Sequence, residues 1–110
     1  MATIDITSLL STSKPTIKIG EHVYEVNDDL ETLFKMEAMG KEEGDAKQIV
    51  EVLKLLLGED GYKRVEKEHE GTTTRLVNLT VLLNAAISAA TGQSFEELQA
   101  ARFQEQAETV

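Results

Sequence analysis

β-prone sequence is confined to one short stretch of this chain, which limits the fold more than any other feature. The stretch covers residues 17–26, IKIGEHVYEV. Its two apolar runs are separated by a Gly-Glu-His segment at residues 20–22, as a tight hairpin requires. The sequence therefore predicts one N-terminal β-hairpin, with Pro15 at the point where order begins.

Helical patterning starts directly after the hairpin. Residues 27–29, Asn-Asp-Asp, offer side-chain oxygens to a helix N-terminus, and Asp28 stands three residues before Glu31 as in a capping box. Apolar residues then recur at the i, i+3, i+4 spacing. We expect a first helix that runs to about Met39.

Two further helices are expected before residue 72. Asp45 caps the first of them, and Gly58 closes it as a residue that tolerates left-handed backbone geometry. Its wide apolar stripe marks a core helix and consists of Ile49, Val52, Leu53, Leu56 and Leu57. A short surface helix over residues 59–70 follows and ends at Gly71.

The longest apolar-leaning segment is residues 72–90, which predicts a helix that Gly92 stops. It is apolar around most of its circumference, so it must be covered by the bundle or by another chain. A transmembrane span is the alternative, but polar residues interrupt a run that would need about 20 apolar residues. Ser94 and Glu97 form a capping box for a final helix with a thin apolar stripe.

These segments predict an α+β fold that is mainly α, with an N-terminal β-hairpin followed by a bundle of about four to five helices. Residues 1–14 are rich in Ser and Thr and are expected to form a flexible N-terminal arm. Residues 15–110 are expected to form a single, mainly helical domain with one modest core.

The charge balance narrows the possible partners. Eleven basic and twenty acidic residues give a formal net charge of −9, which repels nucleic-acid phosphates and anionic lipid headgroups. We therefore expect neither nucleic acid nor membrane as a partner. The chain has no cysteine, and its first thirteen residues carry Asp5 and no basic residue, so neither disulfides nor a signal peptide is expected.

The residues that suggest metal chemistry have more ordinary interpretations. His22 and His69 each stand beside glutamate, but no H-x-x-x-H or cysteine pair supplies the further ligands that zinc needs. Residues 27–31 resemble the start of a calcium loop, yet Leu33 and Met39 occupy the positions of its glycine and its bidentate glutamate. Solvated histidines and a helix cap explain these residues better.

Catalytic constellations are equally poorly supported. Residues 58–61, Gly-Glu-Asp-Gly, lack the lysine and the preceding strand of a phosphate-binding loop, so they predict a turn. The carboxylate pairs at residues 42–43 and 96–97 predict a solvated acidic face, and no serine or threonine has a histidine and carboxylate context. We expect no enzyme activity, no cofactor, and no catalytic, cofactor-binding or metal-binding residues.

Four segments together resemble the small, acidic tail assembly chaperones of long-tailed bacteriophages and prophages. They are the TIKIGEHVYEV hairpin at residues 16–26, the following helix with leucine and methionine, LLLGED at 55–60, and GQSFEE at 92–97. The resemblance covers about residues 16–104 and rests on the order of these segments, the acidity and the length.

The resemblance implies a non-enzymatic protein of the host bacterial cytoplasm, absent from the mature virion. Its implied partners are the tape measure protein, which it binds, and the tail tube protein, whose polymerisation it assists. Self-association is a further expectation left open. The alternative is a structural phage tail or head-tail connector component, and a third interpretation is a bacterial helical adaptor.

The family has no catalytic motif to transfer, so partner contacts follow from the residue pattern alone. One candidate set applies if the long helix is partly uncovered and consists of Leu79, Leu82 and Leu83. The other lies on the final helix and consists of Phe95, Leu98 and Phe103.

Overall fold

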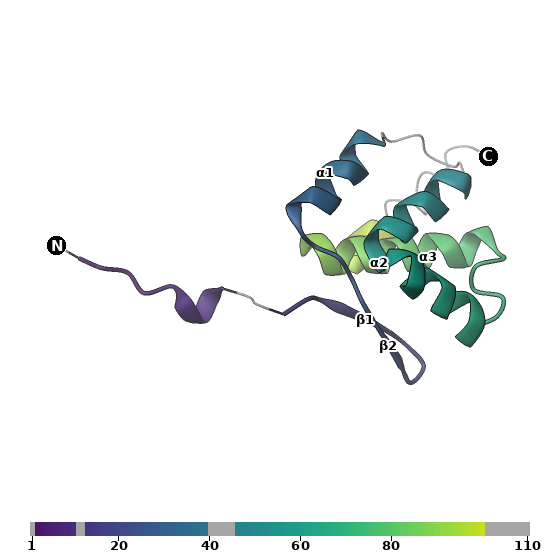
Figure 1. Cartoon of the computed structure of the whole chain (residues 1–110), viewed down its shortest axis with the longest axis horizontal. Helices are drawn as coiled ribbons and strands as arrows, with labels where there is room; N and C mark the ends of the chain where they lie inside the picture. Colours follow the sequence, from purple (N-terminus) through teal and green to yellow (C-terminus); the bar gives the residue numbers. More distant parts are fainter. Residues whose placement is uncertain (1, 11–12, 40–45, 101–110) are drawn as a thin grey trace.

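The elements follow one another as a hairpin and then helices (Figure 1). A computed structural model describes residues 2–10, 13–39 and 46–100. Its elements are a 3-10 turn η1 (Thr7–Leu9), strands β1 (Thr16–Ile19) and β2 (His22–Glu25), and helices α1 (Leu30–Ala38), α2 (Ala46–Glu68) and α3 (Leu76–Thr91). Residues 95–100 are also helical. The predicted α+β, mainly α fold with an N-terminal hairpin is confirmed.

The hairpin closes over a loop of two residues, Gly20 and Glu21. Ile19 pairs with His22 and Ile17 with Tyr24, in antiparallel register. Gly20 has a φ of 61°, which the first loop position of a type II′ turn requires and which glycine adopts without strain. The predicted hairpin is therefore present, but His22 belongs to β2 rather than to the turn.

Helix α1 begins at a capped N-terminus. The Asp29 carboxylate accepts hydrogen bonds from the Thr32 backbone N–H at 3.2 Å and the Thr32 hydroxyl at 2.7 Å. The cap thus lies within the predicted Asn-Asp-Asp segment, but it is Asp29 with Thr32 rather than Asp28 with Glu31. The helix is followed by its C-cap residue Met39, as expected.

The two helices predicted for residues 45–70 form one kinked element, α2. Gly58 interrupts it with φ 76° and ψ 157°, a region that is essentially reserved for glycine. The predicted cap, Asp45, lies outside the described residues. Asn27 caps the turn before the kink, because its backbone N–H donates to the Leu56 carbonyl at 2.7 Å and its side-chain amide to the Leu55 carbonyl at 3.0 Å.

Helix α3 is shorter than predicted at its start, since it begins at Leu76 rather than near residue 72. Its end is as predicted: Gly92 adopts the left-handed conformation, φ 80° and ψ 2°, and donates to the Ser88 carbonyl at 2.9 Å. The Ser94 hydroxyl accepts from the Glu97 N–H at 3.4 Å, which is one half of the predicted capping box. None of the helices in the described residues combines the length and the apolar character that crossing a membrane requires.

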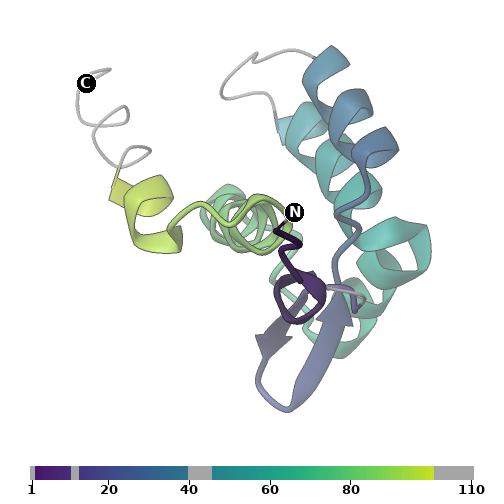
Figure 2. The ribbon, with the colours of Figure 1, turned by 90° about the vertical axis from the view of Figure 1, so that its left-hand side faces the viewer.

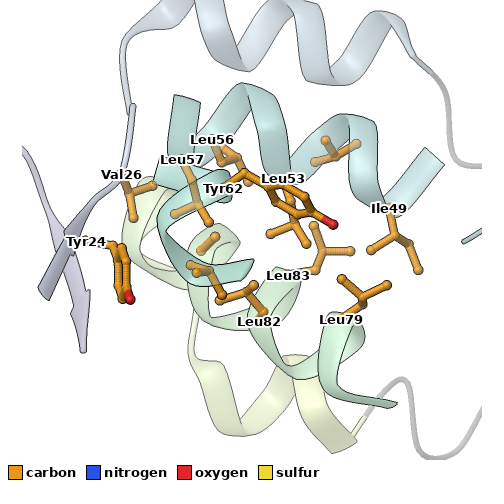
Figure 3. Close-up of a cluster of buried hydrophobic side chains, with 13 residues drawn as sticks. Tyr24, Val26, Ile49, Leu53, Leu56, Leu57, Tyr62, Leu79, Leu82 and Leu83 are labelled. Carbon is orange, nitrogen blue, oxygen red and sulfur yellow. The ribbon is translucent and has the colours of Figure 1, made fainter. Parts of the chain in front are cut away.

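The core lies between α2 and α3 and is closed at one end by the hairpin (Figure 3). From the hairpin come Tyr24, 1% exposed, and Val26, fully buried. The helices supply the remaining buried apolar side chains: Ile49, Val52, Leu53, Leu56, Leu57, Tyr62, Val65, Leu79, Leu82, Leu83 and Ala86. The apolar stripe predicted for α2 is therefore its core face.

Candidate partner-binding groove

An open groove of about 660 Å³ runs between β1 and α3, and we refer to it as the β1–α3 groove. Figure 2 shows α3 nearly end-on, with the hairpin below it and residues 95–100 to its left. The side chains of Ile17 and Ile19 form one wall because alternate residues of a strand share a face. The lining outside β1 is mainly apolar, with three polar side chains, and consists of Thr72, Asn78, Val81, Leu82, Ala85, Ser88, Ala89 and Phe95.

The strand that borders this groove has a free backbone edge. The Val26 N–H donates to the Pro15 carbonyl at 2.8 Å, so the hydrogen-bonded pairs alternate from there along the hairpin. The N–H and C=O groups of Thr16 and Lys18 consequently point away from β2, towards the groove. Among the described residues the sheet has two strands, so no third strand pairs with this edge.

The outer edge of β2, in contrast, is contacted by a side chain of α2. The Val23 carbonyl faces outward and accepts from an Arg64 guanidinium nitrogen at 3.5 Å. Helix α2 packs against β2, while α3 packs against β1. The edge of β1 borders the groove, so a chain bound there would contact both the strand and α3.

Exposed apolar side chains continue the groove along α3. Val77 is 63% exposed and Val81 40% exposed, and one helical turn separates them, so they share a face. Phe95, 37% exposed, also lines the groove. A second exposed apolar pair, Leu30 and Phe34, lies on α1 and does not line the groove.

The candidate contact residues on α3 belong to the core. Leu79, Leu82 and Leu83 are 5%, 4% and 4% exposed, because α2 covers the face of α3 that carries them. The long helix is partly uncovered, which is the condition on which they were proposed, but its uncovered face carries Val77 and Val81 rather than these leucines. The tendency of these two valines to extend the apolar face around the helix was the available signal in the sequence.

The candidates on the last helix have a different outcome. Phe95 lines the groove, and Leu98 is half-buried. Phe103 lies outside the described residues. The helical segment that carries Phe95 is tied to α3 by a hydrogen bond from the amide of Asn84, a fully buried side chain, to the Gln99 side-chain oxygen.

A polar cluster joins the hairpin to the end of α2, on residues that were expected to be separately solvated. His22 Nδ1 lies 3.0 Å from His69 Nε2, and His22 Nε2 lies 3.5 Å from a Glu68 carboxylate oxygen. Glu68 also accepts from Arg64 at 2.9 Å and from the Tyr24 hydroxyl at 3.3 Å. The two histidines are 47 residues apart in sequence, so only the fold brings them together.

Each side chain in this cluster contacts another side chain of the cluster. Within the described ranges, no group of three or more His, Cys, Asp or Glu side chains has the geometry to hold a metal ion. The hydrogen bond from Arg64 is the main cause that lowers the pKa of Glu68 below its ordinary value of 4.5, against an opposing effect of burial. Burial and then the Glu68 charge raise the pKa of the Tyr24 phenol.

The lowered pKa of Glu68 predicts a contribution to stability that acid removes. A carboxyl whose pKa is depressed by folding stabilises the protein above its unfolded-state pKa and loses that effect as pH falls through the lower, folded value. We expect the wild type to lose more stability than Glu68→Gln between about pH 5 and pH 3. Urea denaturation across this range measures it, with the exposed change Glu51→Gln as control; parallel curves for wild type and Glu68→Gln would contradict the assignment.

The other segments weighed for chemistry have structural roles or lie outside the described residues. Asp29 caps α1, and Gly58 forms the kink of α2. Glu96 and Glu97 are exposed, and the acidic pair at residues 42–43 lies in the segment that the structure does not describe.

Comparison of the chain with protein-family models, with curated proteins and with solved structures finds no match.

Proposed function

We propose that this chain is a non-enzymatic phage tail assembly chaperone, which binds the tape measure protein and assists polymerisation of the tail tube protein. The observation that carries the proposal is the β1–α3 groove, whose apolar lining continues into the exposed side chains of Val77 and Val81. A groove of this kind suits an amphipathic helix, which lays its apolar face against it. The implied location is the host bacterial cytoplasm, without retention in the virion.

Charge and groove act together in this proposal. The groove shields apolar side chains of the elongated, helical tape measure, while the net charge of −9 keeps the complex soluble and discourages indiscriminate contacts. Many copies bind along one partner by modest, reversible contacts. Polymerising tube protein then displaces them one after another.

The groove predicts the effect of a charge at its centre. Val81→Asp places a carboxylate where the partner buries apolar surface, and an unpaired charge there is costly to desolvate. We expect at least about a tenfold loss of affinity for the tape measure, which corresponds to about 1.4 kcal/mol. Co-expression pull-down followed by titration of the purified proteins measures it.

Leu30→Asp is the matched control, because it adds the same charge at an exposed apolar position of α1 outside the groove. Retained binding by Val81→Asp, or equal losses in both variants, would count against the groove. A protein inventory of purified particles addresses the function itself. Presence of the chain in particles would favour a structural tail or connector component instead.

A further inference from the structure

We propose that the β1–α3 groove accepts the N-terminal arm of a second copy of this chain, as a strand added to β1. The described part of the arm, residues 2–10, projects away from the helices (Figure 1). Its large apolar side chains are uncovered: Ile4 is 83% exposed, Ile6 48%, Leu9 80% and Leu10 63%. Exposure of such apolar side chains to water is unfavourable, and their burial against another surface stabilises the contact.

The arm has the pattern of a strand that is buried on one face. Ile4 and Ile6 alternate with the polar residues Thr3, Asp5 and Thr7, which is the period of a half-buried strand. An added strand lies about 4.8 Å from β1 and continues its faces. Ile4 and Ile6 then continue the face of Ile17 and Ile19, over the wall of the groove that α3 provides.

The backbone of β1 is ready for such a strand. The N–H and C=O groups of Thr16 and Lys18 point into the groove, and a strand addition pairs them without changing the existing hairpin. Unpaired strand edges of this kind are the usual points at which one chain adds to another.

Charge complementarity favours the arm as the occupant. Lys18 has the opposite strand parity to Ile17 and Ile19, so its side chain lies on the outer face of the hairpin. Asp5 has the same relation to Ile4 and Ile6, so the added strand brings Asp5 and Lys18 to one face as an opposite-charge cross-strand pair. In a chain of net charge −9, an attractive pair at this edge favours the contact between copies.

A second copy supplies this arm more readily than the same copy does. The Pro15 carbonyl is held by the Val26 N–H, which continues the line of β1 beyond Thr16. The arm therefore leaves the hairpin in line with β1 and away from the helices (Figure 1). The neighbouring copy has no such constraint.

The test changes the arm and the groove one at a time, in the purified, full-length chain. Ile4→Ser with Ile6→Ser removes the apolar face of the arm and keeps the groove. Lys18→Pro removes the outward N–H of β1, at a position where an edge strand tolerates proline, and keeps the arm. Sedimentation equilibrium of the wild type is expected to show self-association, and each variant alone to associate at least about tenfold more weakly.

Mixing the two variants gives the decisive outcome, because the arm of one then meets the groove of the other. The mixture is expected to associate more strongly than either variant alone. Lys18→Ala keeps the N–H and loses only the pair with Asp5, so its association should lie between that of the wild type and Lys18→Pro. No gain on mixing, or a wild type that stays monomeric up to about 1 mM, would overturn the proposal.

Because the chain has no cysteine, a single introduced cysteine can carry a spin label that shows where the arm binds. Thr3→Cys carries a spin label in one copy, and an unlabelled ¹⁵N copy reports the broadening. Broadening at residues 16–19 and 81–89 of the ¹⁵N copy is expected. A second, dilute sample in which the spin-labelled chain is itself ¹⁵N-labelled reports contacts within one copy. Broadening at these residues in the second sample but not in the first would show an arm folded on its own groove and refute the inference. Both experiments use this chain alone, so their failure would leave the tape measure proposal standing.

Discussion

Replacing Leu79 with alanine is expected to lower the free energy of unfolding by about 2–5 kcal/mol. Leu79 is 5% exposed and belongs to the core cluster between α2 and α3. Its truncation removes buried methyl groups and leaves a cavity, because the surrounding helices relax only partly. Urea denaturation followed by circular dichroism measures the change.

The same helix offers a matched control in Leu76, 47% exposed and one turn earlier. Leu76→Ala deletes the same atoms from a surface position, so its effect should stay within about 0.5 kcal/mol. The pair also decides what the leucines of α3 do. If Leu79→Ala left stability unchanged and weakened tape measure binding, Leu79 would be a contact residue rather than a core residue.

Features set by neighbouring residues were predictable from the sequence. The hairpin follows from β-prone runs around a glycine, and the end of α3 follows from Gly92, whose left-handed conformation residues with a side chain rarely adopt. The cap of α1 fell within the predicted segment but on a different residue. Asn27, Asp28 and Asp29 all have capping side chains, and the choice depends on where the helical backbone starts.

Features set by contacts between distant segments were not predictable. Gly58 was read as the end of a helix, and it is a kink that Asn27, about thirty residues earlier, caps from the hairpin side. The pattern on α3 is apolar nearly all round, so it could not say which face α2 covers. That choice turned Leu79 into a core residue and left Val77 and Val81 at the surface.

The groove depends on the same long-range information. Its two walls come from β1 and α3, which are more than 50 residues apart in the chain. Among the described residues the sheet has two strands, which leaves the outer edge of β1 without a partner strand, while Arg64 of α2 contacts the Val23 carbonyl at the outer edge of β2. Strand propensity identifies an edge only after the neighbours of the strand are known.

Tyr24→Ala is expected to cost about 3–5 kcal/mol, the range for deleting a buried large aromatic side chain. Tyr24 is 1% exposed, and the Arg64 guanidinium lies 4.6 Å from the centre of its ring. A two-stranded hairpin is marginally stable by itself, so it depends on its packing against the helices. Tyr24→Phe keeps the ring and loses only the hydroxyl bond to Glu68, so about 0.5–1.5 kcal/mol is expected.

Tyr24→Ala should also abolish the groove, because β1 forms a wall only while the hairpin is docked on α3. At temperatures where Tyr24→Ala keeps its helical circular dichroism, amide exchange at Ile17 and Ile19 should become fast while that at Leu82 and Leu83 stays slow. Binding of the arm and of the tape measure should then be lost in Tyr24→Ala and retained in Tyr24→Phe. Retained binding with fast exchange at both isoleucines would mean that α3 and Phe95 suffice for the contact, and that β1 takes no part in it.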